Sequence, residues 1–105
     1  MKIFGSDLCP WCRDCKENFE RNGIPYTWID INASIRNLGI FLKIRDSNPV
    51  FDPAKAVYDI GIPALVDEDR TVILDWQGWI RARGGTVELH HVQTGAACSL
   101  DGKGC

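Results

Sequence analysis

Residues 2–31, "KIFGSDLCPWCRDCKENFERNGIPYTWIDI", decide how this chain folds. The apolar run Lys2–Gly5 predicts a short buried strand, and the β-forming residues of segment 25–31 predict a second. Between them, Pro10 is typical of the first turn of a helix and Gly23 of its end. A strand–helix–strand unit of this kind favours a parallel strand pair joined by a right-handed crossover.

Alternating helices and strands continue along the rest of the chain. The patterns predict helices at 34–46, 52–58 and 76–83, and an antiparallel hairpin of strands 64–66 and 71–74. Segment 86–92 is ambiguous between helix and strand, and the tail is rich in small and turn-forming residues. We therefore expect an α/β fold with a small mixed four-stranded sheet flanked by helices. One domain should span 1–93, followed by an irregular, cysteine-containing tail over 94–105.

Composition limits the partners and the location. The chain has 105 residues, of which 45% are hydrophobic and 25% charged, with a formal net charge of −2. No basic run is present to bind a nucleic acid, and no apolar run approaches the ~20 residues that span a bilayer. The first residues are too polar for a signal peptide, so we expect a cytoplasmic monomer without a nucleic-acid or membrane partner.

The chemistry is concentrated in Cys9-Pro10-Trp11-Cys12. A C-x-x-C sequence between a strand and a helix is typical of a cytosolic thiol redox site. Cys9 should lie at the helix N-terminus, whose free N–H groups favour a thiolate, and Cys12 should lie one turn behind as the resolving thiol. We expect the pKa of Cys9 to lie moderately below the ordinary value of about 8.5, with Asp7 and Asp14 limiting the shift.

Residues 3–31 resemble the opening βαβ unit of glutaredoxins, with Cys9, Pro10, Trp11, Cys12 and then Lys16 matching the family's C-P-x-C-x-x-A-K pattern. The segment "GIPALV" is similar to the one that carries the family's cis-proline, which would be Pro63, preceded by Ile62. The resemblance covers about residues 1–75. It implies a thioredoxin-like fold, a cis peptide bond beside Cys9, and substrate contacts through Pro10, Trp11, Ile62 and Pro63.

The chain departs from that family at the positions that would bind glutathione. Ser6 and Asp7 stand where a lysine is usual, and strand-forming residues that end at Asp75 stand where glutaredoxins have a Gly-Gly pair. The sequence therefore supports thiol–disulfide exchange by a dithiol of this protein better than it supports specificity for glutathione. Protein disulfides and glutathione both remain candidate substrates, and we expect no permanently bound cofactor.

The other three cysteines leave alternatives open. Cys15 is interpreted as a buried thiol or as a third redox or metal-binding thiol. Cys98 and Cys105 are interpreted as an auxiliary redox pair able to exchange with Cys9, or as idle thiols. Their separation would make a small loop on closure, which suits a labile disulfide better than a structural one.

The leading hypothesis is a thiol–disulfide oxidoreductase that uses Cys9 and Cys12. The alternative is a zinc or iron–sulfur module in which Cys9, Cys12 and Cys15 are joined by a tail cysteine. A domain that senses redox state or carries electrons to a partner is a third hypothesis. The pair His90-His91 is not expected to bind a metal jointly, because adjacent side chains point in different directions.

Overall fold

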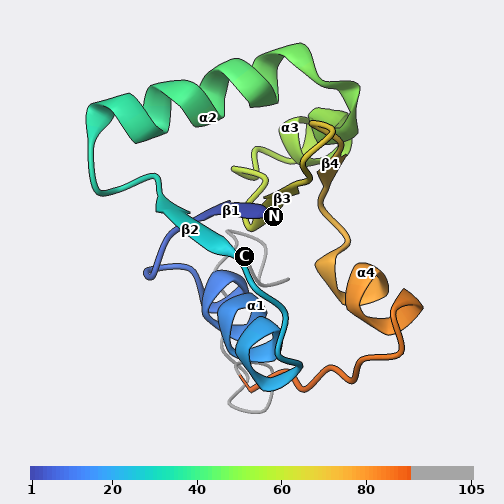
Figure 1. The fold of residues 1–105 in the computed structure, drawn as a ribbon. Coiled ribbons are helices and arrows are strands. Elements are labelled where there is room, and N and C mark those ends of the chain that lie inside the picture. The colour runs from blue at the N-terminus through green and yellow to red at the C-terminus, as the bar shows by residue number, and fades with distance from the viewer. Residues whose placement is uncertain (91–105) are drawn as a thin grey trace.

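The computed structural model describes residues 1–90, so both tail cysteines and the predicted segment 94–105 lie outside the described residues. The elements follow one another along the chain as strands, helices and one short 3₁₀ helix (Figure 1). Their bounds are β1 Lys2–Gly5, α1 Pro10–Arg21, β2 Thr27–Asp30, α2 Ile35–Ser47, η1 Pro49–Phe51, α3 Asp52–Ala56, β3 Ala64–Val66, β4 Val72–Ile73 and α4 Trp76–Ala82.

The predicted mixed sheet is confirmed, with strand order β2-β1-β3-β4. Strands β1 and β2 are parallel, while β3 is antiparallel to both β1 and β4. The strands are shorter than the sequence predicted, because β2 begins only at Thr27 and β4 has two residues. The sheet places the C-terminal end of β1 next to the start of α1, where the cysteines lie.

Helices cover both faces of the sheet, as Figure 1 shows. Side chains alternate between the faces along a strand, so neighbouring residues of β1 enter different cores. Ile3 packs with Cys15 and Phe19 of α1 and with residues of α4. Phe4 packs on the opposite face with Phe41 of α2 and with Phe51. The two apolar clusters fix α1 and α4 on one side of the sheet and α2 on the other.

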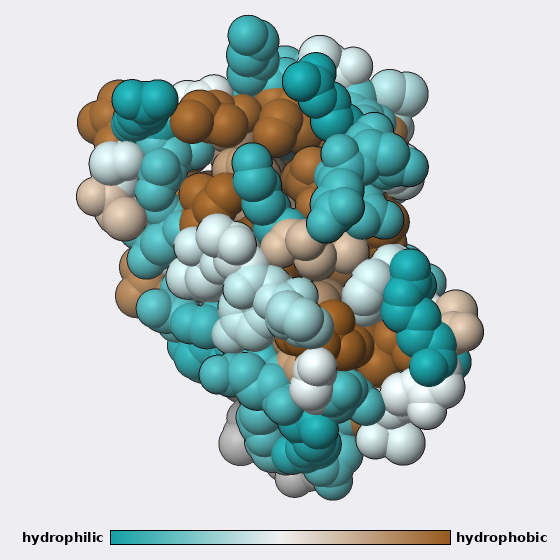
Figure 2. All heavy atoms as spheres, viewed as in Figure 1, coloured by the Kyte–Doolittle hydropathy of each residue, from teal (hydrophilic) through white to brown (hydrophobic). Residues whose placement is uncertain are grey.

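The buried residue of α2 is Phe41, which the sequence pattern did not single out. The sequence aligns Ile35, Leu38, Leu42 and Arg45 along one side of this helix. Phe41 instead is the buried residue, while Ile35 is 85% exposed. The aromatic ring fills the space beside Phe4 and Phe51, with ring centroids 6.0 and 5.9 Å away. Apolar side chains are consequently visible among hydrophilic ones along α2 in Figure 2.

Segment 85–90 forms neither of the two structures that its sequence left open. It is extended but pairs with no strand of the described chain. Val87 and Leu89 pack against the cluster between the sheet and α1, and the alternate residues face outward. Across residues 1–90, no helix is both long and apolar enough to cross a membrane.

Gly5 lies at a crowded point between the strand pair and α1. A Cβ at this position would lie 2.5 Å from the Trp28 ring and 3.1 Å from Cys12 Sγ. Ring atoms of a packed tryptophan cannot move aside without disturbing the core. The absence of a side chain at Gly5 therefore lets Trp28 and Cys12 occupy the same corner.

We predict that Gly5→Ala lowers the free energy of unfolding by about 1–3 kcal/mol, the usual cost of overpacking. Urea denaturation of the reduced protein measures the change. Gly39→Ala in α2 is the matched control, because a Cβ there meets nothing within 4 Å. That substitution should raise stability by about 0.8–1 kcal/mol through helix propensity. Equal effects of the two substitutions would contradict the proposed crowding.

Candidate active site at the start of α1

Cys9 is the N-cap residue of α1, in extended conformation immediately before the helix. A tight turn brings it there, since the Cys9 N–H donates to the Ser6 carbonyl at 3.1 Å. The buried Ser6 hydroxyl accepts a hydrogen bond from the Leu8 N–H at 3.2 Å and holds the same turn. Pro10 follows at the first helical position and has no N–H to leave unpaired. The sequence prediction for this helix start is confirmed.

The two thiols of the motif have different environments. Cys9 is partly accessible, whereas Cys12 is fully buried in the corner beside Gly5. Cys12 comes one helical turn after Cys9, so its thiol can reach the Cys9 sulfur. One thiol is thus open to an incoming molecule, and its neighbour is shielded from solvent.

The pKa of Cys9 is lowered from 9.0 to about 6. The largest cause is the hydrogen bond from the Cys12 side chain, and the backbone N–H groups of Cys12 and Trp11 and the charge of Arg13 act in the same direction. Burial opposes them by penalising the charged form. At neutral pH Cys9 is therefore mainly thiolate. The predicted direction is correct, and the shift is larger than the moderate one expected.

Cys12 has the opposite behaviour. Its hydrogen bond to Cys9 raises the pKa of Cys12 above the usual range, and burial and the Cys9 charge raise it further. The Cys12 thiol therefore keeps its proton while Cys9 carries the negative charge. A single proton is held on the buried sulfur, and the accessible sulfur is the nucleophile.

Asp7 was expected to limit the shift of the Cys9 pKa, but it is not among the groups that act on that pKa. Its carboxylate pairs with Lys16 at 3.0 Å, and its carbonyl accepts a hydrogen bond from Arg13. Lys16 also lies 4.4 Å from the centre of the Trp28 ring. The cations of the first helical turns therefore gather on the same side as Asp7 and offset its charge near Cys9.

A groove of about 200 Å³ lies beside the motif and includes most of the predicted substrate contacts. The peptide bond between Ile62 and Pro63 is cis, as predicted. Trp11 and these two residues line the groove, whereas Pro10 is not among its lining residues. The remaining lining residues are Gly61, Leu74, Asp75, Trp76 and Gln77.

Sequence reasoning missed the contribution of the start of α4 to this groove. Asp75 caps α4, because its Oδ1 accepts a hydrogen bond from the Gly78 N–H at 3.0 Å. Trp76 is 3% exposed and packs into the core, while also lining the groove. An aspartate preceding an apolar helical segment is a recognisable N-cap, and this pattern could have identified the segment.

Cys15 is fully buried against Ile3 and Phe19, which confirms that this thiol lies in the core. Burial raises its pKa, so it remains protonated and unreactive near neutral pH. Among the described residues, the three cysteines of α1 and its N-cap do not gather their sulfurs as a set of metal ligands. Cys98 and Cys105 lie outside the described residues.

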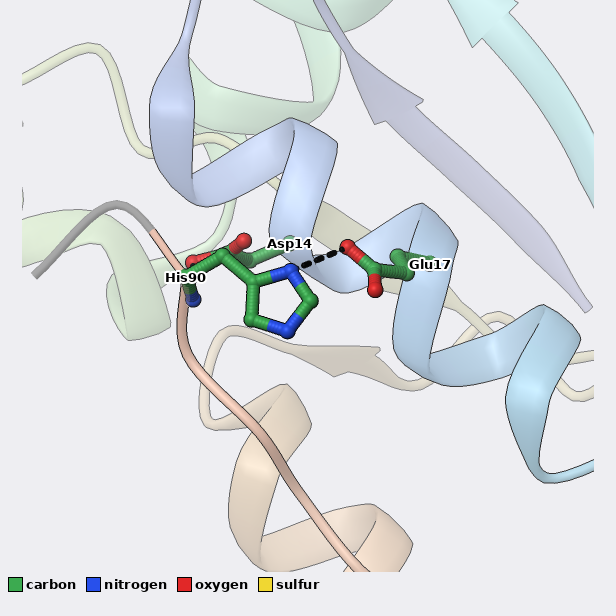
Figure 3. A group of neighbouring side chains, drawn as sticks. All are labelled: Asp14, Glu17 and His90. Carbon is green, nitrogen blue, oxygen red and sulfur yellow. Dashed lines mark hydrogen bonds and ion pairs between the residues drawn. The ribbon is translucent and has the colours of Figure 1, made fainter. Parts of the chain in front are cut away.

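One group of side chains within residues 1–90 has the spacing of metal ligands, namely Asp14, Glu17 and His90, with ligand atoms within 4.8 Å of one another (Figure 3). His90 thus approaches α1, a contact that its sequence position did not reveal. Its Nδ1 lies 3.0 Å from Glu17, and its backbone N–H donates to Asp14 Oδ2. Glu17 also accepts from Arg21 at 2.9 Å. These hydrogen bonds and ion pairs explain why the three side chains lie close together, because they attach the segment that ends at His90 to α1.

Comparison with known proteins identifies a relative. No family model matches the chain, and no solved structure gives a significant match. A protein of Haemophilus influenzae is 36% identical over 73 residues, which cover 70% of this chain and 85% of the relative. The chain belongs to the same family as this bacterial protein, which is described as an uncharacterized protein.

We predict that alkylation of Cys9 by iodoacetamide rises with pH around a midpoint near 6, because only the thiolate reacts. Cys12→Ala removes the hydrogen bond that contributes most, and should move the midpoint toward the ordinary value of 9.0. Cys12→Ser is the control, since a hydroxyl still donates, and its midpoint should shift less. An unchanged midpoint in Cys12→Ala would contradict the assignment of the hydrogen bond.

Proposed function

We propose that this protein is a glutaredoxin-like thiol–disulfide oxidoreductase with a thioredoxin-like fold. The observation that carries the proposal is the Cys9 thiolate at the N-terminus of α1, stabilised by the buried Cys12 thiol. The cis bond before Pro63 and the adjacent groove support it, because both agree with the resemblance in the sequence. We also propose that the protein acts as a monomer in the cytoplasm, where thiols are kept reduced.

The exchange has two steps in this proposal. The Cys9 thiolate attacks one sulfur of a substrate disulfide, and the other substrate sulfur leaves as a thiolate that takes up a proton. Cys12 then loses its proton and attacks Cys9 Sγ, which releases the second substrate thiol and leaves a Cys9–Cys12 disulfide. Two electrons pass from the protein to the substrate.

The electrostatics of the pair favour the second step. The high pKa of Cys12 has its largest cause in the hydrogen bond to Cys9, with the Cys9 charge adding to it. Once Cys9 is bound in a mixed disulfide, its sulfur carries no charge, so both effects weaken. The pKa of Cys12 falls at the stage at which its thiolate is needed.

A protein disulfide is the substrate class that fits the groove best. Its lining is mainly apolar, with the rings of Trp11 and Trp76, and contains no lysine or arginine. The single charged residue is Asp75, which is exposed and negative. Glutathione carries two carboxylates and one ammonium group, so its net charge is negative like that of Asp75, and no lysine or arginine lines the groove to offset it. An uncharged or basic segment beside a protein disulfide meets no such repulsion.

We predict that Cys9→Ser abolishes reduction of insulin disulfides, because serine at this position cannot form the thiolate. Cys12→Ser should retain attack but not release, so a mixed disulfide with the substrate accumulates and is seen by mass spectrometry. Cys15→Ser, which alters a buried core thiol, is the control and should keep the Cys9 chemistry. Full activity in Cys9→Ser, or stoichiometric zinc or iron in anaerobically purified protein, would refute the proposal.

We predict that Asp75→Asn raises kcat/KM for a glutathione mixed disulfide by about two- to fivefold, the size of an exposed charge interaction. Asparagine caps helices as well as aspartate does, so the hydrogen bond to Gly78 is retained. Reduction of a neutral peptide disulfide is the control and should not change. An increase for both substrates would show that the charge of Asp75 does not select between them.

A further inference from the structure

A second groove, of about 440 Å³, lies between α2 and the face of the sheet that is turned away from α1. We call it the α2 groove. It is larger than the groove beside Cys9, and its size falls within the range of about 300–1,000 Å³ that is usual for small-molecule sites. No cysteine of residues 1–90 lines it. The α2 groove is therefore separate from the thiol site.

The sheet provides one wall of the α2 groove. Lys2 of β1 pairs with Val66 of β3, which in turn pairs with Val72 of β4. Directly paired residues of neighbouring strands project from the same face, and Lys2 shares this face with Phe4 because side chains alternate along β1. Phe4, Val66 and Val72 take part in the apolar cluster beneath α2. This wall is thus an apolar surface that carries one cation.

Helix α2 provides the facing wall. Lys43 and Ile44 follow Ile40 by three and four residues, so all three lie on one side of the helix. Ile40 is 43% exposed, and its side chain leaves apolar surface open to solvent. Figure 2 shows apolar surface between hydrophilic side chains below α2. Both walls therefore combine apolar surface with a lysine.

Three cations line the α2 groove, and they come from three different parts of the fold. Lys2 lies on β1, Lys43 on α2 and Arg70 in the turn between β3 and β4. None of them forms an ion pair with another residue of segment 1–90. No aspartate or glutamate of that segment lines the groove. The uncompensated positive charge favours an anionic ligand.

The acidic residues that are near in sequence interact with other groups. Asp46 of α2 lies 3.8 Å from Arg45. Asp67 and Asp69 each accept a hydrogen bond from a backbone N–H of the hairpin turn, and Glu68 is exposed there. The carboxylates of α2 and of the hairpin turn therefore leave the three cations of the groove available to a ligand.

Arg70 has a backbone conformation that glycine adopts at lower cost. Its φ is 70°, in the left-handed region. Its N–H donates to the Asp67 carbonyl, and the Asp67 N–H donates to the Thr71 carbonyl, which closes the hairpin. Glycine is the usual residue at the left-handed position of such a turn. In place of that advantage, the arginine contributes a guanidinium to the α2 groove.

We propose that the α2 groove binds a small amphipathic anion, namely an apolar chain that carries a phosphate monoester. The apolar walls remove the chain from water. A phosphate monoester carries about two negative charges and three acceptor oxygens, so it matches three cations better than a single carboxylate does. A guanidinium such as that of Arg70 binds two of these oxygens at once. The inference goes beyond the proposed function and does not depend on the thiol chemistry.

The experiment titrates isotope-labelled, full-length protein with hexyl phosphate and follows the backbone amides by NMR. Hexyl phosphate is kept below the concentration at which it forms micelles. The signals should shift and saturate as in binding to one site, with the largest changes at residues that line the groove, such as Lys43, Val66 and Val72. Shifts that do not saturate, or that centre on another part of the chain, would overturn the proposal.

Four further ligands separate the two parts of the recognition. Heptanoate has a chain of the same length and one charge, and it should bind more weakly than hexyl phosphate. Hexanol lacks the charge and inorganic phosphate lacks the chain, so neither should saturate the site in the same concentration range. Hexyltrimethylammonium should not bind. Equal affinity of any of these four compounds would contradict the assigned ligand class.

The charge of the groove is tested by Lys43→Gln, which should weaken binding of hexyl phosphate about two- to fivefold. Arg36→Gln is the matched control, since Arg36 is also an exposed cation of α2 but does not line the groove. It changes the net charge by the same amount and should leave the affinity unchanged. Equal weakening by both substitutions would show that net charge, and not the groove, attracts the anion.

The apolar wall is tested by Ile40→Glu, which places a carboxylate in the groove and should abolish binding. Ile35→Glu is the matched control on the same helix, because Ile35 is 85% exposed and does not line the groove. The melting temperature of each variant reports whether it is folded. Retained binding in a folded Ile40→Glu variant would overturn the location of the site.

Arg70→Gly separates binding from stability. Glycine relieves the left-handed backbone at this position, so Tm should rise by a few degrees. The same substitution removes a cation from the groove and should weaken binding of hexyl phosphate about two- to fivefold. A purely structural role of Arg70 would not change the two quantities in opposite directions. Unchanged affinity in this variant would overturn the assignment of Arg70.

Two outcomes distinguish this inference from the proposed function and from another occupant. Cys9→Ser should bind hexyl phosphate as tightly as the unmodified chain, because Cys9 does not line the α2 groove. Loss of hexyl phosphate binding with intact insulin reduction would refute this inference alone. Sedimentation equilibrium should show a monomer with and without hexyl phosphate. A dimer that Ile40→Glu dissociates, together with no effect of hexyl phosphate, would assign the groove to a second copy of the chain and overturn the proposal.

Discussion

The hydrogen bond between Cys12 and Cys9 is the interaction on which the chemistry of this site depends. It lowers the pKa of the accessible thiol and raises that of the buried one, so the two sulfurs share a single proton unequally. The fold supplies the conditions for it. Helix α1 sets the one-turn spacing, and the missing side chain at Gly5 leaves room for the Cys12 sulfur. The two cysteines differ in reactivity because of these surroundings, although their residue type is the same.

Much of the fold could be predicted from short local patterns. The strand–helix–strand start and the hairpin of β3 and β4 each depend on residues close together in sequence. The cis bond before Pro63, in contrast, was expected only from the resemblance of its segment to glutaredoxins. The burial of Cys15 also followed from helical periodicity, because Cys12, Cys15 and Phe19 lie on one face. Local propensity and tertiary packing agree in these segments, and the prediction holds there.

The parts that could not be predicted depend on contacts between distant segments. Phe41 is buried because a gap exists between Phe4 and Phe51, and the periodicity of α2 alone does not reveal that gap. Segment 85–90 pairs with helix side chains, so neither strand nor helix propensity applies to it. The groove combines Trp11 with Ile62 and Asp75, which only the completed sheet brings together.

The low pKa of Cys9 has a consequence for the direction of electron flow. The thiolate exists only when the pair is reduced, so every interaction that favours it stabilises the dithiol relative to the disulfide. In the proposed exchange, oxidation of the pair sacrifices that stabilisation, and the resulting disulfide is a better electron acceptor than one formed from two ordinary thiols. In this proposed cycle, reduction of the Cys9–Cys12 disulfide is therefore the favourable half. Oxidation of the dithiol by the substrate is the demanding half.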